Sequence, residues 1–448
     1  MKIENFIDEL YTVASECQEL DEFEIYYSRG ESFSVKVFQG GIDSYKNAKG
    51  LGVSLRGIVR GKMGYSYTTK ISQKSIHELI AEVLNNGKVL ENRDRVEIYP
   101  GSSQYVPVEN YREDFQEVTP EEKIQFAKDM EEYAKSLDSR VAVVNYSLFQ
   151  SGKGERVLRN SQGLHLSSSS NSGAAYVSVV VREGEENKTG SAFITGNDIA
   201  DYDHKKLAIQ AVEKALEKLG GTPVATGKYP VIFKSEAFTS LLGSFMGIFS
   251  GESVDKGLSL LKGKIGDKIS SENFTLVENP FMEKGSSSRG FDDEGVATAY
   301  KKIIDGGVLT TYLHNLKTAR KFGVQPTGNG FKSSYAGSVG ISATNIYVEE
   351  GEFTWEEIIT KKNEVLILTE LAGLHSGLNP VSGDFSLSAE GFLYRDGKMV
   401  HPVTQVTVAG NFFQLLKNIE ALSDKLEFSM GGIGSPAVLI GELSISGK

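Results

Sequence analysis

The chain has 448 residues, 40% of them hydrophobic and 24% charged, which is ordinary for a globular protein with room for two or three domains. The formal net charge of -11 argues against a general nucleic-acid binder, because such a protein presents a basic face. The single cysteine, Cys17, excludes internal disulfides and multi-cysteine metal sites. The sequence shows neither a signal-peptide-like start nor an apolar membrane span, so we expect a cytoplasmic protein with no membrane partner.

The N-terminal half shows the same order of predicted elements twice. The first set is a helix at 3–19, strands at 22–28, 32–38, 50–58 and 62–68, and a helix at 72–85. The second set is a helix at 119–137, strands at 141–150, 155–160, 174–182 and 188–195, and a helix at 203–219. Thr119 and Pro120 are typical of the N-cap and first position of a helix. We therefore expect a duplicated unit of helix, antiparallel sheet and helix, with modules at 1–90 and 120–222 and a polar linker at 91–119.

Residues 223–448 are rich in predicted strands and glycine turns. Strands are expected at 231–233, 309–313, 345–349, 364–371, 385–394 and 398–405, and helices at 235–249, 312–322, 354–361 and 411–421. This pattern predicts one large curved or barrel-like β domain. The fold class is therefore α+β: a duplicated N-terminal region followed by a strand-rich C-terminal domain.

The predicted helix at 235–249 has two distinct faces. One carries large apolar residues at helical spacing, with Ser235 as the expected N-cap. The other holds only small residues: Ser240, Gly243, Ser244, Gly247 and Gly251. Because an interior glycine costs a helix about 1 kcal/mol relative to alanine, we expect another element to pack very close to this face. The alternative is a helix that lines a catalytic cleft.

This stretch resembles the signature segment of the TldD/PmbA family, once called modulators of DNA gyrase and understood as metal-dependent peptidases that mature or degrade peptides. Its catalytic branch, TldD, carries His-Glu-x-x-x-His on this helix. Matching Leu241-Leu242 and Asp255-Lys256-Gly257 places Gly243, Ser244 and Ile248 at the three motif positions, where none offers an imidazole, thiolate or carboxylate. The family's further ligand is a cysteine in a glycine-rich turn near the C-terminus, and here that turn, 430–436, has none. The chain thus resembles the other branch, PmbA, also called TldE.

Further blocks resemble both branches of the family, and they are 290–295, 303–309, 312–313, 326–330, 382–386 and 409–411. In and directly beside these blocks lie the residues that we regard as candidates for a peptide cleft: Asp292, Asp293, Glu294, His314, Asn329 and Asn411. The run Asp292-Asp293-Glu294 suits a hard cation or a peptide's N-terminal ammonium, and it equally suits a solvated turn that caps a helix. The serine run at 167–170 fits a strand edge or a loop and suggests no chemistry.

The histidines give little support for a metal site in this chain. No two of the six lie within five residues of each other, so the sequence has no helical or hairpin metal pair. His314 can approach the acidic turn, and a scattered site with His375 and His401 is a weak alternative. The sequence also has no phosphate loop, and no Gly-x-Ser-x-Gly motif of a hydrolase nucleophile follows a predicted strand.

The resemblance implies a non-catalytic subunit that needs no cofactor and pairs with a TldD-like catalytic partner holding zinc. Together the two chains would enclose a peptide cleft, in which the partner's zinc-bound water attacks the peptide bond. This chain would shape the cleft and present the peptide as an added strand. Two alternatives remain: a stand-alone enzyme with a divergent site near Asp292, Asp293 and His314, or a binding or regulatory protein without proteolysis. The sequence leaves open whether a homodimer forms in isolation.

Overall fold

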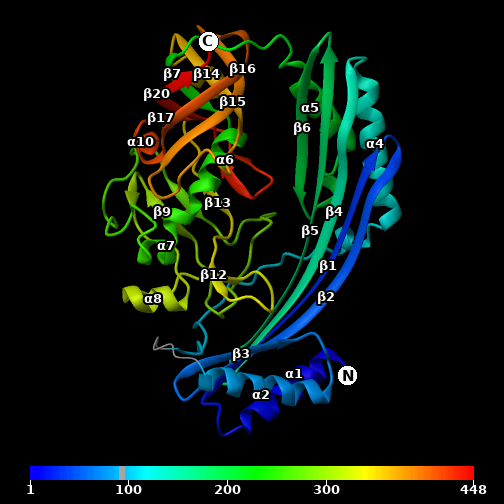
Figure 1. Cartoon of the computed structure of the whole chain (residues 1–448), viewed down its shortest axis with the longest axis vertical. Coiled ribbons are helices and arrows are strands. Elements are labelled where there is room, and N and C mark those ends of the chain that lie inside the picture. The colour runs from blue at the N-terminus through cyan, green and yellow to red at the C-terminus, as the bar shows by residue number, and fades with distance from the viewer. Residues whose placement is uncertain (90–95) are drawn as a thin grey trace.

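The computed structural model describes residues 1–89 and 96–448, so residues 91–95 at the start of the expected linker lie outside the described part. A long curved sheet occupies one side of the molecule, and a strand-rich C-terminal part faces it (Figure 1). Among the described helices, none combines the length and the apolar character needed to cross a membrane.

The curved sheet has six antiparallel strands in the order β3-β2-β1-β4-β5-β6, so the two modules meet at the β1–β4 pair. Each module consists of a helix, three strands and a helix, which confirms the predicted duplication. Their bounds are α1 (Ile3–Ser15), β1 (Glu22–Phe38), β2 (Gly41–Val59), β3 (Lys62–Thr68), α2 (Gln73–Val89), and then α4 (Pro120–Leu137), β4 (Val141–Asn160), β5 (His165–Glu183), β6 (Glu186–Gly196), α5 (His204–Leu216). The short helices α3 (Glu113–Glu117) and η1 (Ile199–Asp201) lie in the connections.

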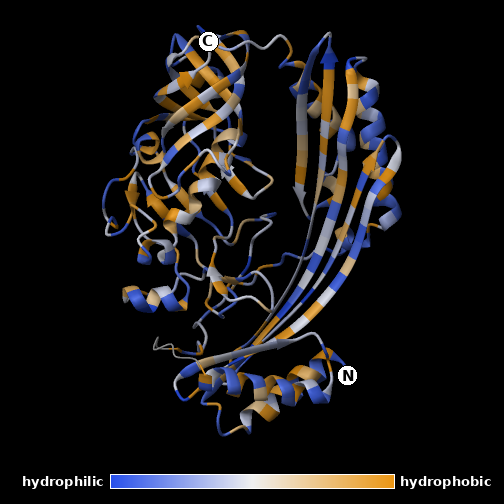
Figure 2. Cartoon of the chain, viewed as in Figure 1, coloured by the Kyte–Doolittle hydropathy of each residue, from blue (hydrophilic) through white to orange (hydrophobic). Residues whose placement is uncertain are grey.

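The strands are longer than the sequence predicted. The predicted breaks at 29–31 and 151–154 do not exist, because β1 has 17 residues and β4 has 20, and Gly30 pairs with both Gly50 and Gly154. The serine run at 167–170 likewise lies within a strand, near the start of β5. Helices cover the two ends of the sheet, α1 and α2 at one and α4 and α5 at the other, and the uncovered middle carries polar residues (Figures 1 and 2). A polar stretch therefore marks an uncovered part of a strand here, and not a turn.

Two helix starts test the capping predictions. Thr119 caps α4 as expected, since its hydroxyl accepts a hydrogen bond from the Glu122 N–H. The Glu122 carboxylate in turn accepts one from the Thr119 N–H. The prediction for Ser235 is wrong. The N-cap of α6 (Ser235–Phe245) is Lys234, without a side-chain cap, and Ser235 is a buried residue of the first turn.

The C-terminal part contains a closed barrel in which β16-β15-β14-β7-β20 pair in order and β20 pairs back to β16, as the barrel-like prediction required. The strand bounds are β7 (Gly227–Phe233), β8 (Leu276–Glu278), β9 (Lys301–Asp305), β10 (Val308–Leu309), β11 (Gly330–Lys332), β12 (Val339–Ile341), β13 (Ile346–Val348), β14 (Glu364–Ala372), β15 (Asp384–Arg395), β16 (Lys398–Asn411), β17 (Ile419–Leu422), β18 (Glu427–Phe428), β19 (Ile433–Ser435) and β20 (Val438–Ser446). The barrel lining and the apolar face of α6 form one core, in which Phe245 stacks on Phe412 at 4.3 Å.

The predicted C-terminal helices are shorter than expected. The helix at 235–249 ends as an α-helix at Phe245, and its last turn is the 3-10 helix η2 (Met246–Phe249). The other helices are α7 (Gly251–Asp255), α8 (Leu316–Phe322), α9 (Trp355–Ile359) and α10 (Phe412–Lys417). The strand expected at 309–313 is reduced to β10, because Leu313 turns away to pair its backbone with Phe249 and Gly251.

Candidate functional site

The small-residue face that begins on α6 is open at Gly247 among the described residues and closely packed at Gly251. The Ser240 and Ser244 hydroxyls donate to backbone oxygens four residues earlier, at 2.8 and 2.9 Å, so both are turned back onto the helix. A Cβ added at Gly247 would have no atom within 4 Å, and one at Gly243 would meet only Ile433 Cδ1, at 3.1 Å. The expectation of close packing along this face is therefore wrong at Gly247. It holds at Gly251, where a Cβ would lie 2.5 Å from His314 Nδ1.

The acidic turn is buried, although its sequence is typical of a solvated one. The side chains of Asp292, Asp293 and Glu294 are only 0%, 3% and 5% exposed. Asp292 accepts hydrogen bonds from three backbone N–H groups, those of Glu294, Val296 and Gly330, at 2.8–2.9 Å. It therefore holds the turn and the start of β11 in place.

The other two acids join the C-terminal part to the curved sheet. Asp293 accepts from Arg156 Nη1 on β4 at 2.8 Å, from Tyr26 on β1 at 3.3 Å and from the Lys332 N–H at 2.8 Å. Glu294 accepts from the Leu316 N–H at the start of α8 at 2.8 Å, and its other oxygen lies 3.5 Å from Arg56 Nη1 on β2. The donors come from five separate parts of the chain, β1, β2, β4, α8 and β11, so this turn acts as a junction.

Burial sets the electrostatics of this junction. It raises the pKa of Asp292 well above the ordinary value, with the negative charge of Glu294 as the second cause, and it also raises the pKa of Glu294. Burial and then the like charge of Arg56 lower the pKa of Lys332 to about 8. Nζ of Lys332 has no hydrogen-bond partner among the described residues and lies over the Tyr26 ring at 4.2 Å.

His314 lies near the junction along the chain, but its ring belongs to a packed core. Nδ1 lies 3.1 Å from the Thr318 hydroxyl, and the ring packs against Tyr312 and Phe322. Burial lowers the pKa of His314 to about 4, so the ring is neutral at physiological pH.

The remaining candidates occupy separate places in the fold. Asn329 is fully buried and donates to Glu278 at 2.8 Å and to the Ser342 carbonyl at 2.9 Å. Asn411 caps α10 and donates to Asp384 at 2.9 Å. His375 is exposed between β14 and β15, and His401 lies on β16 with Nδ1 2.7 Å from the Pro402 oxygen. The fold therefore keeps Asn329 beside the acidic turn, because Asp292 binds the N–H of the next residue, Gly330, and it disperses Asn411, His375 and His401.

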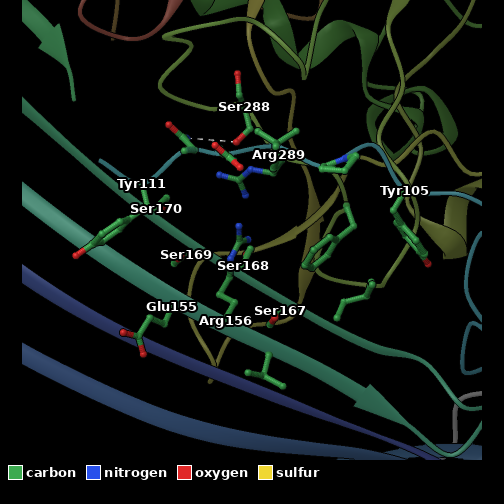
Figure 3. A pocket seen from close by; sticks show the side chains of 18 of the residues that line it. Tyr105, Tyr111, Glu155, Arg156, Ser167, Ser168, Ser169, Ser170, Ser288 and Arg289 are labelled. Atoms are coloured by element: carbon green, nitrogen blue, oxygen red, sulfur yellow. Dashed lines mark hydrogen bonds between the residues drawn. The ribbon is translucent and has the colours of Figure 1, made fainter. Parts of the chain in front are cut away.

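A cavity of about 680 Å³ lies between the curved sheet and the loops before the acidic turn. Its walls come from β4, β5, the segment 105–111 and the segment 286–291 (Figure 3), and residues of α1 also line it. Arg156, Ser168 and Ser170 lie on the sheet side, and Arg289 and Ser288 lie opposite. The cavity therefore shares Arg156 with the acidic turn.

Comparison with known proteins agrees with this architecture along almost the whole chain. Three models of one family match it: PmbA/TldA metallopeptidase domain 1 at 23–87, the central domain at 113–219, and the C-terminal domain at 226–447. The chain belongs to the PmbA/TldD metallopeptidase family. Metalloprotease PmbA of Escherichia coli O157:H7 is 29% identical over 333 residues, covering 74% of this chain and 71% of that protein. A Metalloprotease TldD homolog of Haemophilus influenzae is 26% identical over 455 residues, covering 96% and 93%.

Solved structures of the family show the same fold. A crystal structure described as a modulator of DNA gyrase from Thermotoga maritima is 31% identical and superposes with a TM-score of 0.92 over 99% of this chain and 100% of that one. TldE from Thermococcus kodakarensis is 24% identical with a TM-score of 0.90, covering 99% and 100% of the two chains, a likeness of fold.

The PmbA/TldD fold allows the zinc positions that the sequence suggested to be tested by their chemistry. The fold brings α6 and the C-terminal turn together, since a Cβ at Gly243 would lie 3.1 Å from Ile433 Cδ1. Ile248 is buried in the barrel core, and the Ser244 hydroxyl is bonded within its own helix. These residues do not fit zinc, because an alkyl group occupies the place of a donor. Among the described residues, no three His, Cys, Asp or Glu side chains are grouped to hold a metal ion.

Sequence reasoning missed the basic side of this region. Arg56, Arg156, Arg289 and Lys332 all lie around the acidic turn, yet only Arg289 is near it in sequence. One signal was present: Arg56 stands at an alternate position of a strand whose other face carries Leu51, Val53 and Leu55. A charge at an inward position of a strand indicates a buried ionic partner.

Proposed function

We propose that this chain is a non-catalytic, PmbA-type subunit of a peptidase complex that degrades or matures peptides in the cytoplasm. Its partner is a TldD-like chain that holds zinc through His-Glu-x-x-x-His and supplies the general base. The proposal rests on the position of Ile433 beside Gly243, because an alkyl side chain occupies the place where metal donors would be needed. Membership of a metallopeptidase family supports a role in peptide cleavage.

In the proposed complex, the open small-residue face of α6 lines the space that the partner completes. Gly247 leaves room beside this face for an extended peptide or for the partner's backbone. This agrees with the cleft interpretation of the stripe, since no described residue of this chain packs on Gly247.

The stand-alone alternative needs a reactive group at the acidic turn. There, Asp292 is saturated by three backbone N–H groups, and Asp293 is bound to Arg156, Tyr26 and Lys332. Carboxylates bound in this way stabilise a turn, and they are poorly placed to accept a proton from a substrate. The geometry favours the subunit proposal over this alternative.

The test is reconstitution with a TldD-like protein that bears the complete motif. Hydrolysis of an unstructured peptide is measured for this chain alone, for the partner alone and for the mixture, and size-exclusion chromatography follows complex formation. We expect no turnover by this chain alone, and a mixture whose activity exceeds that of the partner and disappears with chelator.

The matched control is the same mixture made with a partner whose motif Glu is changed to Gln. We expect this mixture to assemble and to be inactive. Chelator-sensitive cleavage by this chain alone, or the absence of any complex with the partner, contradicts the proposal.

A further inference from the structure

The side chain of Arg289 lies in the cavity of Figure 3 without a counter-ion bound to it. Its guanidinium lies over the Phe331 ring, 4.7 Å from the centroid. Nε is buried and has no hydrogen-bond partner in the described part of the chain, and no ion pair reaches the group. A buried guanidinium that makes no hydrogen bond carries a desolvation cost which a bound anion would offset.

A second guanidinium, that of Arg156, faces Arg289 across the cavity (Figure 3). Burial and then the like charge of Arg156 lower the pKa of Arg289 to about 10, so the Arg289 guanidinium remains charged at neutral pH. Arg156 is held in place by Asp293 at 2.8 Å, which matches its charge. The pair therefore carries about one unmatched positive charge.

The rest of the cavity supplies serine hydroxyls and one apolar wall, and the carboxylates of Glu4, Glu109 and Glu155 also line it. Ser168 pairs with Arg156 across β4 and β5, and Ser170 lies two residues further along the same face. Neither serine hydroxyl has a hydrogen-bond partner among the described residues. On the other side, the rings of Tyr105 and Phe291 meet edge to face, 6.2 Å apart, and line the cavity.

We propose that this cavity binds a peptide carboxylate between Arg289 and Arg156, with an apolar side chain against Tyr105 and Phe291. A guanidinium binds a carboxylate through two parallel N–H groups, and one unmatched charge suits a monoanion. A phosphate dianion would bring a second negative charge close to Asp293. The carboxylate is that of a peptide C-terminus or of an Asp or Glu side chain, and naming a peptide as its source rests on the proposed function.

The experiment uses calorimetric titration of the full-length chain alone with short peptides. The first pair is N-acetylated Ala-Ala-Ala-Leu as the free acid and as the C-terminal amide. The second pair is an amidated peptide with one central Glu, and the same peptide with Gln. We expect one acid form to bind about 10- to 100-fold more tightly than its neutral counterpart. The pair that shows the difference identifies the source of the carboxylate.

The decisive variant is Arg289→Met, which removes the charge and keeps a long side chain over Phe331. We expect it to lose the preference for the acid form and to bind the neutral form as before. The matched control is Lys398→Met on the exposed end of β16, which changes the net charge equally outside the cavity and should retain the preference. If Arg289→Met does not fold, the comparison of acid and neutral peptides on the unaltered chain decides by itself.

Equal binding of acid and neutral peptides, or a preference that survives in Arg289→Met, overturns the proposal. Tighter binding of inorganic phosphate than of the peptide acid also overturns it. Because these measurements use this chain alone, they are independent of the reconstitution with a partner. A failure of the subunit proposal would appear there and would leave the carboxylate preference unchanged.

Discussion

Replacing Asp293 with alanine tests the conclusion that the acidic turn joins the C-terminal part to the curved sheet. The change removes the acceptor of Arg156, Tyr26 and the Lys332 N–H at once, and it leaves these donors at a site that is 3% exposed. Breaking a buried ion pair typically costs about 3–5 kcal/mol, because the remaining charge stays unpaired. We therefore expect Asp293→Ala to lower the free energy of unfolding by about this amount.

The corresponding shift in melting temperature follows from the size of the chain. With about 2.1 cal/mol/K per residue, 448 residues unfolding as one unit have an unfolding entropy of about 0.94 kcal/mol/K, so 3–5 kcal/mol lowers Tm by about 3–5 °C. If the C-terminal part unfolds separately, its smaller entropy makes the shift larger. Differential scanning calorimetry measures this directly.

The control for this change is Asp305→Ala, which removes an exposed pair with Lys302 at 3.0 Å. Exposed pairs contribute about 0–1 kcal/mol, so Tm should move by about 1 °C or less. A Tm for Asp293→Ala that equals that of Asp305→Ala would refute the junction.

Three further outcomes are expected. Gly251→Ala places a Cβ 2.5 Å from the His314 ring and should destabilise the fold by about 1–3 kcal/mol. Gly247→Ala instead places its Cβ in open space and should stabilise the fold by about 0.4–1 kcal/mol, and thermal melts of the two variants test both predictions. Because burial lowers the pKa of His314 to about 4, its neutral form stabilises the fold above the unfolded pKa of about 6.5, and this contribution, at most about 3 kcal/mol, is lost as pH falls from 6.5 to 4. Denaturant titrations at pH 7 and 4.5 should therefore show a smaller loss for His314→Gln than for the unaltered chain. Placing the complete His-Glu-x-x-x-His motif at Gly243, Ser244 and Ile248 should give no peptidase activity, because the third ligand is absent and Ile248 is buried in the core. Chelator-sensitive cleavage of an unstructured peptide by this variant would contradict the prediction.

Local signals predicted most of the helices and the order of the modules. Thr119, Pro120 and Glu122 mark the start of α4 because a capping box depends only on residues three apart. Alternating apolar residues likewise mark both ends of β1, where helices cover one face. Strand β20 was missed, although it completes the barrel, because its apolar run Val438–Ile440 is interrupted by Gly441.

The burial of the acidic turn could not be predicted from local sequence. Three adjacent carboxyl groups favour water unless partners are supplied, and here the partners lie far away along the chain. Tyr26 and Arg156 are 267 and 137 residues from Asp293. Only the assembled sheet, which places β1, β4 and β5 side by side, brings these donors to one point. The same assembly creates the cavity of Arg289, which no motif in the sequence indicates.

The metal positions show how a fold of this family can lack the donors of a zinc site without losing its shape. A zinc site on this fold requires α6 and the C-terminal turn to converge, and they do, since Gly243 and Ile433 are in contact. What differs is the chemistry of the side chains, because a glycine and an alkyl group stand where imidazole and thiolate donors are needed. The arginine pair lies in a separate cavity against the sheet, so binding a peptide there does not depend on those donors. A chain with this arrangement is suited to orient a peptide by its carboxylate while a partner cleaves it, and the carboxylate titration and the reconstitution test these two parts separately.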